Sequence, residues 1–315
     1  MPAAGTPATT PGSERRWAQM LGSLAALLPS GIRCVLVDGP AGQAELFAGR
    51  LTEELAARGA EAAVTTDSRA AWDLAVFLRT PHGGRERAER AHVVVDLHDV
   101  TWPVIRRVAA PLAGQGPWYL TETRAFFACR AATWDTKFGD DGPAYRAAVA
   151  GAGIRRGGTA IDIGCGTGRA LPPLRAAVGP AGAVIALDIT PEMLQAARPA
   201  AVAARAVRVL GDARVLPFAD QSADVIFAAG LVNHLPDTEA GLRELARVTR
   251  PGGLLVLFHP SGRAALAARH GHSVTHDEPL AEGPLRRSTA ASCWHLTAYD
   301  DGPHRFFAVA ERRPG

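Results

Sequence analysis

Short apolar runs alternate with longer amphipathic stretches throughout the second half of the chain. Five runs have the length and composition of buried strands: residues 159–163, 183–188, 206–210, 223–229 and 253–259. The stretches between them have helical length, and such alternation predicts a parallel sheet covered on both faces. Two more strand-like segments, 292–300 and 304–312, are joined by the turn Asp-Gly-Pro, so the last pair is antiparallel. The pattern predicts an α/β fold with a Rossmann-like sheet of seven strands, the last of them antiparallel.

The first half of the chain shows the same alternation in a shorter form. Residues 33–39, 72–80 and 92–99 are typical of buried strands, and residues 43–59 are typical of a helix that ends at Gly59. A helix capped by Thr121 follows a stretch with the composition of a linker. The predicted division is a disordered tail over 1–16, a smaller α/β domain over 17–112, a linker over 113–120 and a second domain over 121–315.

Composition and charge exclude several classes of protein. The chain has 315 residues, and its formal net charge is only +3 with the charges interspersed, so nothing suggests a nucleic-acid partner. No apolar stretch approaches the roughly 18 residues of a membrane span. The Cys residues lie far apart, which is typical of a reduced, cytoplasmic protein. Lys137 is the only lysine among many arginines, a bias expected of a GC-rich bacterial genome.

The stretch "IDIGCGTGRALPPL", residues 161–174, places a glycine-rich turn between a strand and a helix. Such a turn lets the backbone approach a nucleotide closely at the carboxyl end of a first strand. A dinucleotide fingerprint needs Gly or Ala where this chain has Arg169, so the spacing disfavours NAD. Asp162, just before the turn, can offer a carboxylate to an amino group. The pattern favours a nucleotide cofactor without phosphates.

Two more acidic residues end the next two strands. Asp188 is placed to accept hydrogen bonds from ribose hydroxyls, and Asp212 lies within reach of an adenine amino group. Either residue alone is more typical of a helix cap or a turn. Together with Asp162 they close three successive strands, which favours a binding site.

Five ordered motifs then resemble those of class I S-adenosylmethionine-dependent methyltransferases, in the ubiquinone/menaquinone-type small-molecule branch: "IDIGCGTG", "ALDIT", "GDARVLPF", "DVIFAAGLVNHLPD" and "LRELARVTRPGGLLVLFHP". The resemblance covers residues 120–312 and implies S-adenosylmethionine as the cofactor. It implies these contacts: Asp162, Gly164, Cys165, Gly166 and Gly168 around the methionine part, Asp188 on the ribose, Ile189 and Met193 beside the adenine, Asp212 and Ala213 at its edge, Ala229 and Gly230 under the sulfonium, and Trp134 and Lys137 from a capping segment.

Methyl transfer relies on alignment and on the exclusion of water, and it needs a base only where the acceptor must lose a proton. His234 follows the fourth strand and is the candidate catalytic base, although it can equally shape the pocket or cap a helix. His259 is a weaker candidate. The group His270, His272 and His276 is interpreted as a loop near the acceptor, and no metal site is predicted.

The predicted function is transfer of a methyl group to an oxygen, nitrogen or carbon atom of a small molecule. The alternative is a catalytically silent S-adenosylmethionine-binding regulatory or scaffold protein. Nucleic-acid acceptors lack support because the fourth strand ends in "AAGL" rather than an "NPPY"-type tetrapeptide.

The smaller first domain resembles, in pieces, uridine-kinase-like P-loop proteins. The stretch "VLVDGPAGQAEL" has Ala44, Glu45 and Leu46 where a phosphate loop needs Gly, Lys and Ser or Thr. A glutamate there repels phosphates, and leucine cannot bind magnesium. We therefore expect a degenerate P-loop-like domain that serves packing, acceptor binding or formation of a homodimer.

Overall fold

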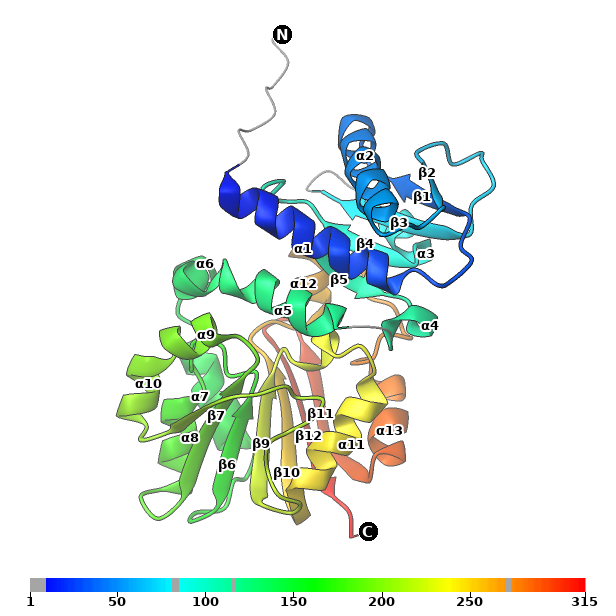
Figure 1. The fold of residues 1–315 in the computed structure, drawn as a ribbon. Helices are drawn as coiled ribbons and strands as arrows, with labels where there is room; N and C mark the ends of the chain where they lie inside the picture. Colours follow the sequence, from blue (N-terminus) through cyan, green and yellow to red (C-terminus); the bar gives the residue numbers. More distant parts are fainter. Residues whose placement is uncertain (1–9, 81–84, 115–116, 270–272, 315) are drawn as a thin grey trace. The chain divides into compact units, whose positions relative to one another are not determined.

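The computed structural model describes residues 10–80, 85–114, 117–269 and 273–314 (Figure 1). The chain divides into two compact units, Met1–Phe126 and Phe127–Gly315. The boundary falls inside helix α5, Trp118–Ala128. The sequence placed a linker at 113–120 and a cap at Thr121, but the structure continues this helix through Thr121, because buried Trp118 and Tyr119 give it an apolar face.

Unit 1 is a five-stranded sheet in the order β2-β1-β3-β4-β5 among the described residues. Its strands are β1 Cys34–Asp38, β2 Ala63–Thr65, β3 Leu74–Arg79, β4 Val93–Asp96 and β5 Val104–Val108, and its helices are α1 Pro11–Leu27, α2 Ala41–Ala57, α3 Arg85–Arg90 and α4 Ala110–Ala113. Strands β1 to β4 are parallel, and β5 is antiparallel to β4. This is a doubly wound arrangement; whether the unit descends from a P-loop protein stays a prediction.

Helix α1 corrects the predicted disordered tail. Thr10 caps this helix by accepting a hydrogen bond from the Ser13 amide, and the helix begins at Pro11, so residues 11–16 are ordered. The helix buries Trp17, Met20 and Leu24, which lie at helical spacing. The Pro-rich composition led to the prediction of disorder. Proline is also favoured in the first turn of a helix, so composition alone did not show where α1 begins. Residues 1–9 lie outside the described part of the chain.

Unit 2 contains a sheet in which the structure describes seven strands, in the order β11-β12-β10-β9-β6-β7-β8. Its strands are β6 Thr159–Ile163, β7 Ala183–Asp188, β8 Val207–Leu210, β9 Ala223–Ala229, β10 Thr249–His259, β11 Trp294–Gly302 and β12 Arg305–Arg312. Its helices are α6 Trp134–Phe138, α7 Gly142–Gly151, α8 Leu171–Val178, α9 Pro191–Ala196, α10 Arg198–Ala203, α11 Thr238–Val248, α12 Arg263–Arg269 and α13 Glu282–Ala291, with 3-10 turns η1 Ala131–Thr133 and η2 Val232–His234.

Strand β12 is antiparallel to both β10 and β11, while β6 to β10 are parallel. Figure 1 shows α11 and α13 on one face of the sheet and α7, α8 and α10 on the other. The strands alternate accordingly: Ile161 and Ile163 pack with α11, and Ala160 packs with α7 and α8. The predicted Rossmann-like α/β fold with a mixed sheet is confirmed. Within the described ranges, no helix is long and apolar enough to cross a bilayer.

Candidate active site

The residues singled out from the sequence lie at one edge of the sheet in unit 2. Strands β6, β7, β9 and β10 are parallel and central, so their carboxyl ends share this edge. The glycine turn, Asp188, Gly230 and His259 follow or end these four strands in turn. In open α/β sheets, ligands bind outside the carboxyl ends of the strands, which makes this edge the candidate site.

The glycine turn has a backbone that only glycine adopts without strain. Gly164, Gly166 and Gly168 have φ angles of 72°, 53° and 86°. The amides of Gly164 and Cys165 both donate to the carbonyl of Leu187 on β7, at 2.8 and 3.0 Å, which fixes the turn to the neighbouring strand. A Cβ atom added at Gly166 would have no protein atom within 4 Å. The turn therefore leaves open space above Gly166, where a ligand can approach the backbone.

Gly168 has a second constraint, and a substitution there tests it. An added Cβ would lie 2.9 Å from Leu171 Cδ1 and 3.1 Å from Ala200 Cβ. We expect Gly168→Ala to destabilise unit 2 by about 2–4 kcal/mol, the sum of left-handed strain and overpacking. Gly166→Ala is the matched control, because it adds only the strain of about 1–2 kcal/mol. Urea denaturation of both variants checks this, and equal losses would contradict the packing argument.

Asp162 is the most unusual group of the site. It lies on β6 with 1% of its surface exposed, and its Oδ2 atom is buried with no hydrogen-bond partner. Burial, together with the charge of Asp188, raises the pKa of Asp162 to about 8. A buried carboxyl oxygen without a partner is costly and rare in folded proteins. Its position beside the glycine turn fits a cationic or hydrogen-bond-donating ligand atom.

Asp188 ends β7 and is held toward the glycine turn. Its Oδ2 accepts a hydrogen bond from the Gly166 amide at 2.9 Å, and its Oδ1 accepts one from the Thr190 amide at 2.8 Å. Burial raises the pKa of Asp188, although these two backbone donors oppose the shift. The side chain is thus fixed in one orientation at the strand end, as a residue that binds ribose hydroxyls must be.

The other predicted cofactor contacts differ in exposure. Met193 and Ala213 are buried, and Ile189, Ala229 and Gly230 are half-buried. Asp212 forms an ion pair with Arg214, whose Nη2 donates a hydrogen bond to it at 2.7 Å. Asp212 can therefore bind an adenine amino group only if this ion pair breaks. Cys165 is buried, and burial raises the pKa of its thiol well above the usual value. These properties fit a packing role for Cys165 rather than a nucleophile.

An aromatic group stands beside the carboxyl end of β9. His234, in η2, meets the ring of Phe127 edge-on at 5.2 Å, and Phe127 lies 5.8 Å from the ring of Trp134. His259 Nδ1 accepts a hydrogen bond from the Ser261 amide at 3.1 Å. His234 therefore contacts the ring of Phe127, which in turn contacts Trp134. His270 and His272, and the side chain of Lys137, lie outside the described residues.

The sequence reasoning missed a group of polar residues around Arg169. Arg169 Nε and Thr167 Oγ1 both donate to Asp135 Oδ1, at 3.0 and 2.7 Å, and Arg169 Nη1 donates to Asp141. The signal was present in the sequence, because an arginine stands where a dinucleotide site needs Gly or Ala. Its partners, however, lie roughly 30 residues earlier, which spacing alone does not reveal.

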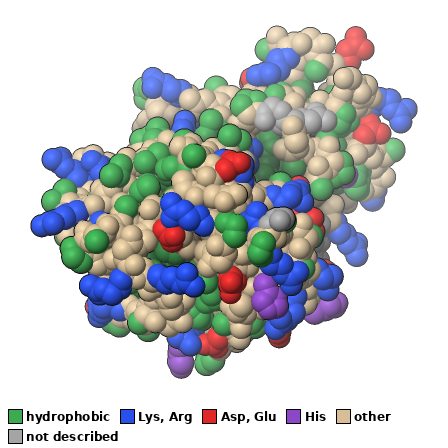
Figure 2. Space-filling model, turned by 90° about the horizontal axis from the view of Figure 1, so that it is seen from below, with side chains coloured by type: hydrophobic (Ala, Val, Ile, Leu, Met, Phe, Trp, Pro, Cys, Tyr) green, Lys and Arg blue, Asp and Glu red, His purple; other side chains and the backbone are tan. Residues whose placement is uncertain are grey.

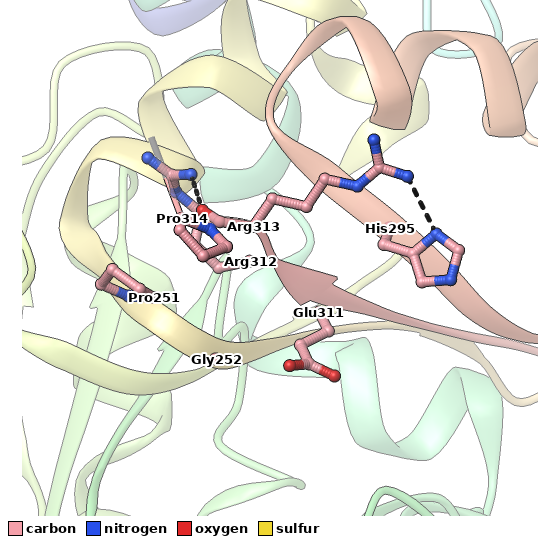
Figure 3. A pocket seen from close by; sticks show the side chains of 7 residues that line it. All are labelled: Pro251, Gly252, His295, Glu311, Arg312, Arg313 and Pro314. Carbon is pink, nitrogen blue, oxygen red and sulfur yellow. Dashed lines mark hydrogen bonds between the residues drawn. The ribbon is translucent and has the colours of Figure 1, made fainter.

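A shallow cavity of about 510 Å³ lies at the opposite edge of the sheet (Figure 3). It is lined by Pro251 and Gly252 at the start of β10 and by His295 on β11, with Glu311 to Pro314 on the third side. In Figure 3, the Arg313 guanidinium points to His295, and its Nη2 lies 3.1 Å from His295 Nδ1. The cavity drawn in Figure 3 contains none of the predicted site residues.

The face shown in Figure 2 carries many arginine side chains interspersed with acidic ones.

Comparisons with known proteins identify similar proteins for part of unit 2. Residues 161–257 match the family model described as a methyltransferase domain. Demethylmenaquinone methyltransferase of Staphylococcus aureus is 36% identical over 110 residues, which are 35% of this chain and 46% of that protein. The chain thus spans less than half the length of the curated relatives it matches.

Solved structures of lower identity resemble the chain as well. A SAM-dependent methyltransferase from Aquifex aeolicus aligns with 53% of this chain and 88% of its own, at 23% identity and a TM-score of 0.45. Geranyl diphosphate C-methyltransferase from Streptomyces coelicolor A3(2) aligns with 54% and 78%, at 11% identity and a TM-score of 0.44. Residues 161–257 of unit 2, which include the glycine turn, Asp188 and His234, thus match a methyltransferase domain.

Proposed function

We propose that this protein transfers a methyl group from S-adenosylmethionine to an oxygen, nitrogen or carbon atom of a small molecule. The observation that carries the proposal is the buried, unpartnered Asp162 Oδ2 on β6, the strand that leads into the glycine turn with its open backbone at Gly166. The α-ammonium of the cofactor would supply the missing donor. The domain match and the likeness to a demethylmenaquinone methyltransferase support the same reaction class.

Each of the other predicted site residues would contact a different part of the cofactor. Asp188 would bind the ribose hydroxyls, Ile189 and Met193 would flank the adenine, and Asp212 with Ala213 would contact its edge. Ala229 and Gly230 would lie under the sulfonium, and Trp134 would cover it, with Lys137 as a further contact. When bound, S-adenosylmethionine supplies an electrophilic methyl group on a cationic sulfur. The protein would contribute alignment and the exclusion of water.

The acceptor would enter beside His234. The rings of Phe127 and Trp134 make this wall apolar, which suits a flat small molecule better than a charged polymer. His234 would take a proton from the acceptor where the nucleophile needs deprotonation. Whether this proton transfer occurs depends on whether the attacking atom of the acceptor is carbon, nitrogen or oxygen.

We extend the proposal to location and to unit 1. The structure has all four cysteines free, which supports a reducing, cytoplasmic location. Unit 1 would bind the acceptor or join two copies of the chain, since Glu45 stands in place of a phosphate-binding lysine.

Calorimetry tests the proposal directly. We expect S-adenosylmethionine to bind with micromolar affinity, and Asp188→Ala to weaken binding on the order of 100-fold through loss of charged hydrogen-bond acceptors. Asp220→Ala is the matched control, because this exposed carboxylate precedes the amino end of β9. Absence of binding by the unaltered protein would refute the proposal, and ATP binding instead would mean that unit 1 keeps its kinase-like site. Binding with no methyl transfer to any acceptor screened would favour the silent regulatory protein.

A further inference from the structure

A short segment of unit 2 contacts the residues that follow β6 and β7, and Phe127 links it to His234 after β9. We call residues 131–141 the cap; it contains η1, α6 and the stretch that leads into α7. The 3-10 turn η1, which leads directly into α6, lies against α9, and α9 follows β7. Asp135 of α6 meets the glycine turn that follows β6. Trp134 packs on Phe127, which meets His234 after β9.

Arg169 binds the cap at two points that differ in exposure. One point is Asp141, and there both side chains are 14% exposed. The other is Asp135, whose side chain is 63% exposed, although Thr167 also donates to it. Water and salt compete with the exposed contact far more than with the shielded one. The Asp135 contact is therefore the weaker of the two.

A hinge residue, Gly139, lies between the contacts of Arg169 with Asp135 and with Asp141. Gly139 ends α6 with φ 69° and ψ −166°, a backbone conformation that is essentially limited to glycine. An added Cβ there would have no protein atom within 4 Å, so the space on that side of the residue is open. Rotation about Gly139 would move Asp135 and Trp134 while Asp141, which precedes α7, stays in place.

We propose that Arg169 is a positioning residue that clamps the cap over the glycine turn. The cap opens for cofactor exchange when the contacts to Asp135 break and α6 turns about Gly139, with Arg169 still bound to Asp141. In the closed state the clamp holds Trp134 against Phe127 and so shapes the wall beside His234. This inference rests on the proposed function, since it assigns the covered site to S-adenosylmethionine.

The release rate of S-adenosylhomocysteine, measured by stopped-flow displacement on the full chain, tests the clamp. We expect Asp135→Asn to release it about three- to tenfold faster, because an exposed ion pair is lost while an acceptor for Thr167 remains. We also expect added salt to accelerate release from the unaltered protein but not from this variant. Arg169→Lys should also accelerate release, since the single ammonium group of lysine cannot bind both carboxylates as the guanidinium does. Asp220→Asn is the control, because this exposed carboxylate also pairs with an arginine, Arg247, but lies outside the cap.

The outcomes separate the two proposals. If the unaltered protein fails to bind S-adenosylhomocysteine, the proposed function is refuted. If it binds but Asp135→Asn leaves the release rate and its salt dependence unchanged, the clamp is overturned and the function stands. A merely structural role of Asp135 would lower the unfolding midpoint without changing the salt dependence of release.

Discussion

S-adenosylmethionine is expected to bind more tightly as the pH rises toward about 8, with one proton released on binding at neutral pH. The cause is Asp162, whose pKa is raised to about 8 by burial and by the charge of Asp188. A cationic group of the cofactor would favour the ionised carboxylate, so below this pKa binding must first remove the proton. The affinity should then change by up to about tenfold per pH unit.

The same shift has an opposite effect on the protein without cofactor. In the unfolded chain the pKa of Asp162 is near the ordinary 3.8, so the folded state binds a proton that the unfolded state releases. The stability from this group is fully present below about pH 4 and is lost as the pH rises through about 8. Cofactor binding and stability without cofactor should therefore respond to pH with opposite signs over this window.

Asp162→Asn separates these two effects. The amide keeps the shape of the carboxyl group and cannot ionise, so we expect cofactor affinity to fall on the order of 100-fold and proton release to vanish. The unliganded variant should lose the decline in stability between about pH 4 and pH 8. Calorimetry in buffers of different ionisation enthalpy measures the released proton, with Asp220→Asn as a control. Proton release that persists in Asp162→Asn would assign the shifted group elsewhere.

The strands of unit 2 could be predicted closely from the sequence because buried parallel strands are short apolar runs bounded by glycine or acidic residues. The runs at 159–163, 183–188 and 223–229 coincide with β6, β7 and β9. Strands β2 and β5 of unit 1 were missed, since β2 is short and partly exposed and β5 contains two arginines. Edge strands are less apolar than central ones, so pattern alone identifies them poorly.

The candidate site, too, could be predicted only in part from the sequence. Asp162, Asp188 and the glycines could be predicted because each ends or follows a strand, and the topology brings strand ends together. The Arg169 contacts could not, because Asp135 and Asp141 lie on a segment outside the strand pattern. Likewise, nothing in the pattern around Arg16 indicates that its charge is buried, although the structure pairs it with Glu122 on α5.

That buried pair leads to the largest stability effect we expect in unit 1. Arg16 and Glu122 are 1% and 0% exposed, and Arg16 Nε also donates to the Pro103 carbonyl at 2.8 Å. Glu122 further accepts a hydrogen bond from the Ile105 amide at 2.9 Å, which ties α5 to β5. Burial raises the pKa of Glu122, although Arg16 opposes the shift. The pair therefore joins α1, α5 and β5 at the cost of two desolvated charges.

Glu122→Ala is expected to destabilise unit 1 by about 3–5 kcal/mol, because it leaves the Arg16 guanidinium and the Ile105 amide buried without the carboxylate. Glu14→Ala, which breaks the more exposed pair with Arg50, should cost no more than about 1 kcal/mol. Replacing both partners, by Arg16→Met with Glu122→Leu, should restore much of the stability, since no unpaired charge remains. Hydrogen exchange of the α1 and β5 amides in the full chain measures all three. A double variant no more stable than Glu122→Ala would show that the pair stabilises unit 1 by its geometry rather than merely balancing two buried charges.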